Sequence, residues 1–282
     1  MLRITTRNAR FQEWQALLAN RKKRQRAGEF IAHGVRPITL AVRHGWPIRA
    51  LIYDPARPLS AWAQSMLAAA GGAVQAGLAP ELLRELGEKA EDAPELVAVI
   101  AMPADDYARI PVPVDFLGVA LDRPSSPGNI GTVVRSADAF GASGVMVTGH
   151  GADPYDPRAV RASTGSLFAV PVVRDQSPAG VLAWVHEQRA AGLPLTVLGS
   201  DERGEAGVAE HDLTGPTLIV TGNEATGLSG AWRAACDRVA RIPITGSATS
   251  LNAASAATVF LYEAARQRRA APGAAGRREG LT

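Results

Sequence analysis

The stretch that most constrains the fold reads SPGNIGTVVRSADAFG and spans Ser126 to Gly141. It follows the apolar segment Phe116–Leu121, so the pattern predicts a buried strand, a Pro-Gly turn and a helix. Apolar residues recur at positions 130, 133, 134 and 137, which puts Arg135 on the other side of the helix. Arg135 and Asn129 could face an anionic substrate, although a surface ion pair between Arg135 and Asp138 is the simpler interpretation of this stretch alone.

Strands and helices alternate on both sides of this stretch. Downstream, apolar strands at Gly144–Thr148, Leu195–Gly199 and Leu218–Thr221 precede a last helix at Leu251–Arg268, which favours parallel βαβ units. Upstream lies a separate alternating α/β unit that begins with one helix over Thr6–Gln25. The predicted division is a first domain at 1–103, a proline- and acid-rich linker at 104–114, a second domain at 115–269 and a disordered tail at 270–282.

Composition excludes several classes of protein. The 282 residues contain a single cysteine, Cys236, so the chain cannot rest on an internal disulfide framework. Charged residues or prolines interrupt every apolar run before it reaches the roughly 18 residues of a membrane span. The N-terminus also has arginines where a signal peptide needs an apolar run. We therefore expect a cytoplasmic protein with no membrane partner.

The net charge of +3 is unevenly distributed along the chain. Residues 1–26 hold eight basic side chains and one acidic side chain, Glu13. Residues 266–282 hold five arginines and one acid, Glu279, so the sequence between these ends is acidic. A polyanion such as RNA would meet the N-terminal segment first. A solvated helix face is an equally good interpretation of this basic run taken by itself.

Two further stretches place polar groups after predicted strands. LIVTGNEATGLS, from Leu218, runs into Gly222 and Glu224, where a glycine would let a ligand lie against the backbone and a carboxylate would supply an acceptor. RIPITGSATSLNAASAATVFLYEAARQR, from Arg241, enters a helix whose first turns hold small residues suited to close packing against another backbone or another subunit. Locally, ordinary loop residues and a helix N-cap at Ser250 explain these stretches equally well.

Several common cofactor motifs are missing from the sequence. No GxGxxG follows a predicted strand, and no GxxxxGK[ST] phosphate loop occurs. The five histidines are scattered, and none lies in a CxxC or HExxH frame. We therefore predict neither a dinucleotide fold of the usual kind nor a metal site.

In this order, the three stretches resemble the motifs of the SpoU/TrmH family of RNA 2′-O-ribose methyltransferases, part of the SPOUT superfamily. The resemblance covers residues 116–268 and departs mildly at Ala225, where the family often has glycine. It implies a parallel-sheet SPOUT domain with a C-terminal trefoil knot, S-adenosylmethionine as methyl donor, and a homodimer. The first domain resembles the αβα, ribosomal-protein-like RNA-binding domain of rRNA-modifying members. The chain as a whole resembles members that methylate 23S rRNA and confer resistance to a ribosome-targeting antibiotic.

The resemblance also implies roles for individual residues. Those implied to act in catalysis and substrate positioning are Asn129, Arg135, Glu224, Ser250 and Asn252. Those implied to contact S-adenosylmethionine, mainly through backbone groups, are Gly222, Ile242 and Leu251. The family's usual proposal makes the arginine the base, yet a guanidinium stays protonated in proteins. Arg135 more reasonably lowers the proton affinity of the hydroxyl and holds the adjacent phosphate, which leaves the proton acceptor open. No metal is implied.

Two other functions stay open from the sequence. A non-catalytic RNA-binding protein of the same fold is disfavoured by the intact set of polar residues. A tRNA 2′-O-ribose methyltransferase is disfavoured by the additional first domain, although that argument is one of fold analogy.

Overall fold

The computed structural model describes residues 2–88 and 93–271, and the predicted tail therefore lies outside the described residues from position 272 onward. The chain divides into two compact units. Unit 1 comprises Met1–Ala104 together with Asp153–Ala169. Unit 2 comprises Asp105–Ala152 together with Val170–Thr282. The first unit therefore includes a segment from the second half of the sequence.

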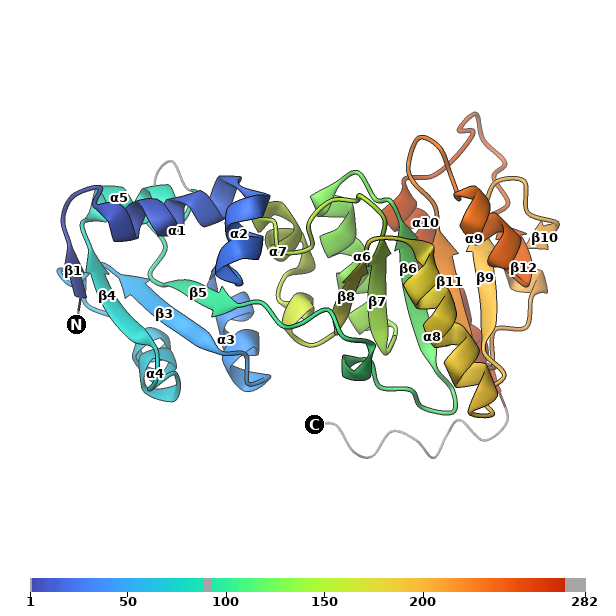
Figure 1. The fold of residues 1–282 in the computed structure, drawn as a ribbon, viewed down its shortest axis with the longest axis horizontal. Coiled ribbons are helices and arrows are strands. Elements are labelled where there is room, and N and C mark those ends of the chain that lie inside the picture. The colour runs from blue at the N-terminus through green and yellow to red at the C-terminus, as the bar shows by residue number, and fades with distance from the viewer. Residues whose placement is uncertain (1, 89–92, 272–282) are drawn as a thin grey trace. The chain divides into compact units, whose positions relative to one another are not determined.

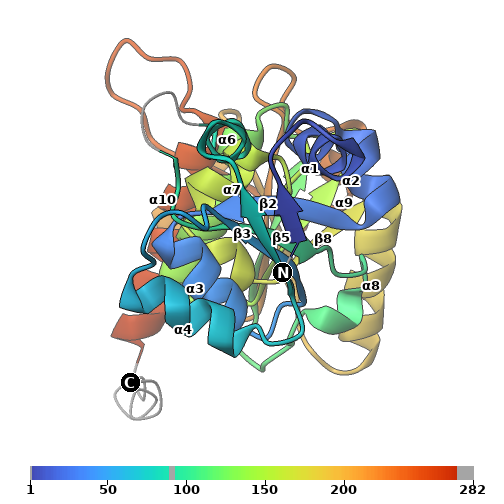
Figure 2. The ribbon, with the colours of Figure 1, turned by 90° about the vertical axis from the view of Figure 1, so that its left-hand side faces the viewer.

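Unit 1 is built around a five-stranded mixed sheet with the strand order β1-β4-β3-β5-β2. Strands β1, β4 and β3 pair in parallel, whereas β5 pairs antiparallel with both β3 and β2. Helices α1 and α2 lie on one side of the sheet and α3 and α4 on the other (Figures 1 and 2), which gives the predicted αβα layering. Its elements are β1 (Leu2–Ile4), α1 (Ala9–Ala19), α2 (Arg21–Ala27), β2 (Glu29–His33), α3 (Val35–Arg43), β3 (Ile48–Tyr53), α4 (Ala61–Ala69), β4 (Val74–Leu78), α5 (Pro80–Leu86), β5 (Val97–Ala101), α7 (Pro157–Ser163) and the 3-10 helix η2 (Ser166–Phe168).

The prediction of one helix over Thr6–Gln25 is wrong, because Asn20 divides this segment into α1 and α2. Asn20 has an extended backbone, with φ −123° and ψ 105°, and its side chain accepts a hydrogen bond from the backbone N–H of Lys23 at 3.1 Å. An asparagine that caps a new helix interrupts the old one even where the helical pattern of apolar residues continues.

This break turns Arg24 into the interior of unit 1, where it is 1% exposed. Its Nε donates to Asp153 at 2.8 Å, and one terminal nitrogen donates to the carbonyl oxygens of Leu17 at 2.8 Å and Leu18 at 3.1 Å. A buried guanidinium needs such partners, since the cost of removing it from water is otherwise large. One member of the basic run is therefore structural and cannot contact a polyanion.

Unit 2 is built around a seven-stranded sheet with the order β10-β12-β9-β11-β6-β7-β8. All of its strand pairs are parallel, as the alternating sequence predicted. Its elements are the 3-10 helix η1 (Tyr107–Arg109), β6 (Leu117–Asp122), α6 (Pro127–Ala139), β7 (Gly144–Thr148), β8 (Val172–Asp175), α8 (Pro178–Ala190), β9 (Thr196–Ser200), β10 (Ala206–Gly207), the 3-10 helix η3 (Val208–Glu210), β11 (Thr217–Thr221), α9 (Gly230–Ala235), β12 (Arg238–Arg241) and α10 (Ala253–Ala270).

Helices cover both faces of this sheet (Figure 1). On one face, Trp184 of α8 and Trp232 of α9 belong to the same buried cluster as Phe116, which directly precedes β6. Helices α6 and α10 pack against each other, and the Ser136 and Thr258 hydroxyls join them through a 2.7 Å hydrogen bond. Parallel sheets covered on both faces consist of almost wholly buried strands, which explains the uninterrupted apolar sequences of β6, β7 and β11.

Candidate active site

The carboxyl ends of two central neighbouring strands bring the three polar stretches together. Strand β6 leads through Ser125 into α6, and β11 leads into Gly222 and Glu224. These two strands pair directly, so their carboxyl ends lie side by side. Ligands of open α/β sheets bind at this edge, where loops leave the strands.

Glu224 joins the first two stretches. Its carboxylate accepts hydrogen bonds from Asn129 Nδ2 at 2.7 Å, from the Ser125 backbone N–H at 3.0 Å and from the Ser125 hydroxyl at 2.8 Å. Partial burial raises the pKa of the Glu224 carboxyl, but these hydrogen bonds outweigh burial and leave its pKa below the ordinary value. Glu224 is therefore a carboxylate at neutral pH and acts as an acceptor.

Asn252 links the third stretch to this pair. Its Nδ2 donates to Asn129 Oδ1 at 3.3 Å, and its Oδ1 accepts from the backbone N–H of Ala254 at 2.9 Å. Asn252 is therefore the N-cap of α10, and the interpretation of Ser250 as that cap is wrong. Asn129, Glu224 and Asn252 form a polar cluster. Its two hydrogen bonds join Asn129 to residues that lie 95 and 123 positions away in sequence.

A pocket of about 700 Å³ opens beside this cluster in unit 2. Five of the eight predicted site residues line it: Gly222, Glu224, Ile242, Ser250 and Leu251. Asn129 is connected to this pocket through its hydrogen bond to Glu224, and Asn252 through its hydrogen bond to Asn129.

Gly222 is required by the protein's own backbone, whatever ligand the pocket holds. A Cβ at this position would overlap the backbone of Gly227 and Leu228. Asn223 and Gly227 exchange backbone hydrogen bonds of 3.0 and 2.9 Å, so the loop closes tightly on itself above Gly222. The glycine therefore accommodates the protein's own backbone.

Arg135 is exposed on α6, six residues beyond Asn129, a rise of about 9 Å along the helix. Within residues 2–88 and 93–271, it has no hydrogen-bond or ion-pair partner, so the ion pair with Asp138 does not form. The structure does not bring Arg135 into the polar cluster, and its guanidinium is left available to a ligand.

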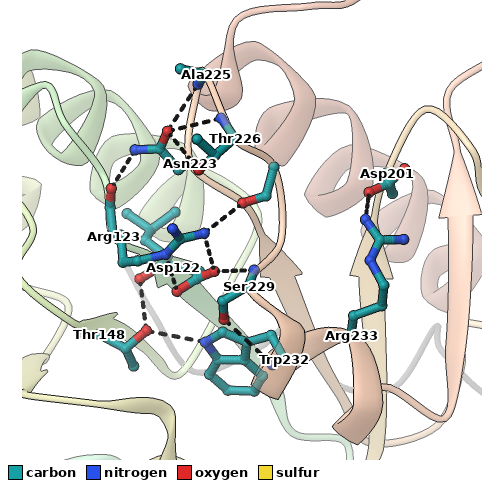
Figure 3. Close-up of polar contacts among 12 residues, drawn as sticks. Asp122, Arg123, Thr148, Asp201, Asn223, Ala225, Thr226, Ser229, Trp232 and Arg233 are labelled. Atoms are coloured by element: carbon teal, nitrogen blue, oxygen red, sulfur yellow. Dashed lines mark hydrogen bonds and ion pairs between the residues drawn. The ribbon is translucent and has the colours of Figure 1, made fainter.

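Asp201, Thr221 and Arg233 are among the pocket-lining residues that were not predicted from the sequence. The Asp201 carboxylate accepts from Arg233 (Figure 3). It also accepts from the backbone N–H of Arg203 at 2.9 Å. Asp201 directly follows β9, so the rule that ligands bind at strand ends could have identified it. Thr221 is 4% exposed, and its hydroxyl has no partner in the described part of the chain.

Two family models match the chain. The SpoU L30e-like domain matches residues 8–98, and the SpoU rRNA Methylase family matches residues 117–262. The chain belongs to the SpoU methylase family. The predicted resemblance and the two predicted kinds of domain are thereby confirmed.

The SpoU relatives include a characterised enzyme of nearly the same length. The 23S rRNA (uridine(2479)-2′-O)-methyltransferase of Streptomyces viridochromogenes is 61% identical over 266 residues, which are 94% of this chain and 92% of that protein. Among solved structures, the SpoU methyltransferase AviRb from the same organism, in complex with AdoMet, superimposes with a TM-score of 0.89 at 61% identity. That alignment covers 93% of this chain and 98% of AviRb.

A more distant SpoU relative has the same architecture. The AdoMet-bound rRNA methyltransferase from Sinorhizobium meliloti is 30% identical, with a TM-score of 0.83. The alignment covers 94% of this chain and 97% of that one. The similarity to this relative therefore extends over both the L30e-like domain and the methylase domain of the chain.

The pocket suits AdoMet, the methyl donor of SpoU enzymes, in size and in the chemistry of its lining. Ile242 and Leu251 offer apolar contacts for an adenine ring, and the buried Thr221 hydroxyl offers an unused polar group. The carboxylates of Asp201 and Glu224 are compatible with the positive charge of a sulfonium and an amino group. Among the described residues, no cluster of three or more potential metal ligands occurs, and no helix is long and apolar enough to cross a membrane.

Proposed function

We propose that this protein transfers the methyl group of S-adenosylmethionine to a ribose 2′-hydroxyl of 23S rRNA. The observation that carries the proposal is the cluster of Asn129, Glu224 and Asn252 beside a pocket of cofactor size. The 61% identity to a 23S rRNA 2′-O-methyltransferase over nearly the whole chain supports both the reaction and the substrate class.

In this proposal, Gly222, Ile242 and Leu251 contact S-adenosylmethionine from the pocket wall. The bound cofactor supplies an electrophilic methyl group on a sulfonium. The chain's own residues then have mainly to align the ribose oxygen with that methyl group and assist loss of its proton. Ser250 lines the pocket and is assigned to substrate positioning with the polar cluster.

The hydrogen bonds assign directions to the cluster. Asn252 donates to the amide oxygen of Asn129, so the amide nitrogen of Asn129 faces Glu224. Glu224, ionised at neutral pH, holds that amide and the Ser125 turn in a fixed arrangement. Arg135, which is unpaired among the described residues, holds the phosphate next to the target ribose and lowers the proton affinity of its hydroxyl.

We extend the proposal to the assembly and setting of the enzyme. Residues 1–103 bind the RNA substrate, residues 115–269 form the methyltransferase domain, and the chain threads a C-terminal trefoil knot in a cytoplasmic homodimer. Ala254 and Ala257 at the start of α10 are buried within the chain, whereas Ala253, Ser255 and Ala256 are not buried and are small enough to allow close contact with a second copy. The sequence resemblance to members that confer resistance to a ribosome-targeting antibiotic extends the proposal to such a role.

The test is transfer of tritiated methyl groups from S-adenosylmethionine to ribosomal RNA, followed by mapping of the labelled nucleotide. We expect label on a single 23S ribose and none on tRNA. Label on tRNA alone would contradict the proposed substrate, and absence of label on any RNA would contradict the activity. The Asn129→Ala variant, which loses the central member of the cluster, should give at least about 100-fold less label.

A further inference from the structure

A second polar network lies beneath the cofactor loop, defined here as residues 222–229, and centres on the last residue of β6. Asp122 is 1% exposed, yet it is ionisable and must be compensated by partners. Its Oδ2 accepts from the backbone N–H of Ser229 at 2.6 Å, and its two oxygens accept from Arg123 at 3.2 and 3.1 Å (Figure 3). One end of the cofactor loop is thus fixed to the end of β6.

Arg123 supplies two more attachments to the same loop. The terminal nitrogen that contacts Asp122 also donates to the carbonyl oxygen of Gly227 at 3.0 Å. The backbone carbonyl of Arg123 accepts from Asn223 Nδ2 at 2.7 Å. Asp122 and Arg123 therefore hold the cofactor loop at Asn223, Gly227 and Ser229 (Figure 3).

The backbone of Arg123 is in an unusual conformation that suits this role. Its φ of +52° lies in the left-handed region, which side chains other than glycine rarely adopt. The conformation is held by its own backbone N–H, which donates to Thr148 at 2.9 Å, as well as by the contacts to the loop. Strained residues fixed by many surrounding contacts are concentrated at functional sites.

The cofactor loop depends on these attachments because its tip is otherwise exposed. Ala225 and Thr226 at the tip are exposed, and among the described residues their backbone N–H groups bind the side chain of Asn223 alone, at 2.9 and 3.1 Å. Asn223 is in turn oriented by Arg123. Glu224 makes the remaining link, through Ser125 and Asn129, to the start of α6.

We propose that Asp122 and Arg123 are positioning residues that fix the cofactor loop in its binding shape before S-adenosylmethionine arrives. The inference rests on the proposed function, since it takes the pocket as the cofactor site. The described lining of that pocket includes Asn223, Gly227 and Glu224 but neither Asp122 nor Arg123. The pair therefore acts through the loop, by removing the cost of ordering it when the cofactor binds.

The decisive variant is Arg123→Gly. Glycine adopts a φ of +52° without strain, so the β6 junction keeps its shape while the guanidinium is lost. We expect the Kd for S-adenosylmethionine, measured by calorimetry, to rise about 10-fold or more, because a charge-assisted contact to the loop is removed. The value of kcat at saturating cofactor should change less than about threefold, and the Kd for rRNA should be unchanged.

Two further variants separate positioning from general stability. Arg123→Lys keeps a cation near Asp122 but cannot form the same fork to Asp122 and Gly227, so its cofactor Kd should lie between those of the wild type and Arg123→Gly. Arg189→Ala is the matched control, since Arg189 also binds a carboxylate, that of Asp237, and a carbonyl, that of Leu195. Neither partner lines the cofactor pocket as described, so the cofactor Kd should be unaffected.

The outcomes distinguish this inference from the proposed function. A wild-type protein that does not bind S-adenosylmethionine would overturn both. Wild-type binding with an equal Kd in Arg123→Gly would overturn only the positioning role. An increase in Kd that appears equally in Arg189→Ala, or that is matched by an equal weakening of rRNA binding, would show a general loss of structure and would also overturn it.

Discussion

Neutralising the exposed cations of α2 should weaken RNA binding in a way that depends on salt. Lys22, Lys23 and Arg26 are the residues to change, because their side chains are exposed, whereas Arg24 is buried and the exposed Arg21 already has another interaction. Lys22 and Arg26 lie one turn apart on the helix, and Lys23 lies beside them. Each phosphate contact contributes about 0.7 to 0.9 to the slope of log K against log salt, so the triple Gln variant should lose about 2 to 3 units of slope.

The assay is filter binding of a 23S rRNA fragment over a series of salt concentrations. A matched triple variant carries Gln at Arg43, Arg49 and Arg57, which are exposed cations on or after α3 and β3 in the same unit. An unchanged slope in the α2 variant would refute this helix as an RNA contact. Equal loss of slope in both variants would refute a localised contact surface. The methylated nucleotide should be the same throughout, since phosphate contacts carry no sequence information.

Three further predictions concern single contacts. Arg135→Ala should lower methyl transfer by at least about 100-fold in the tritium assay, and near wild-type turnover would contradict its role. Calorimetry should show unchanged cofactor binding, because Arg135 is exposed and lies outside the described pocket lining. Hydrogen bonds hold the folded pKa of Glu224 low, so its contribution to unfolding free energy is present above about pH 4.3 and is lost as pH falls through the folded pKa. The exposed position limits this contribution to below about 1 kcal/mol, and urea titrations of Glu224→Gln should show a flatter acid limb than the wild type. Arg24→Met should cost about 3 to 5 kcal/mol, because it removes the guanidinium that balances the buried charge of Asp153. Asp153→Asn in the same chain should restore part of the loss, and equal urea midpoints for the single and double variants would argue against the pair.

Much of the fold was predictable wherever local sequence and tertiary structure agree. Strand β7 has the predicted bounds, Gly144–Thr148, since it is a short apolar run closed by turn residues. Strand β4 was missed because its sequence, VQAGL, contains Gly77, which weakens a strand signal. The structure supplies a reason for the glycine: a Cβ at Gly77 would lie 3.0 Å from the Pro55 ring, so a larger residue would press on Pro55.

The site was predictable in its members but not in its connections. Motif order identified Asn129, Glu224 and Asn252, yet nothing local shows that each holds the next through a hydrogen bond. The same limit applies to the basic run, in which the sequence does not show that Arg24 is buried, because its partner Asp153 lies 129 residues away. A run of charges in sequence specifies where a helix is polar, whereas only the packed structure specifies which charge faces inward.

Asp122 and Gly222 illustrate why the supporting residues are hardest to predict. Asp122 closes an apolar strand and resembles an ordinary strand-end carboxylate, but its burial and its bond to Ser229 arise only when β6 and β11 pair. Gly222 does signal a close approach, and its sequence neighbours suggested that a ligand makes it; the approaching atoms are those of Gly227, five residues later. In both cases the residue type records a steric or electrostatic requirement without recording its partner. The partner of Asp122 is the loop that lines the pocket, although Asp122 itself is not part of the described lining. A substitution at Asp122 should therefore change the affinity for S-adenosylmethionine without removing a direct contact to it.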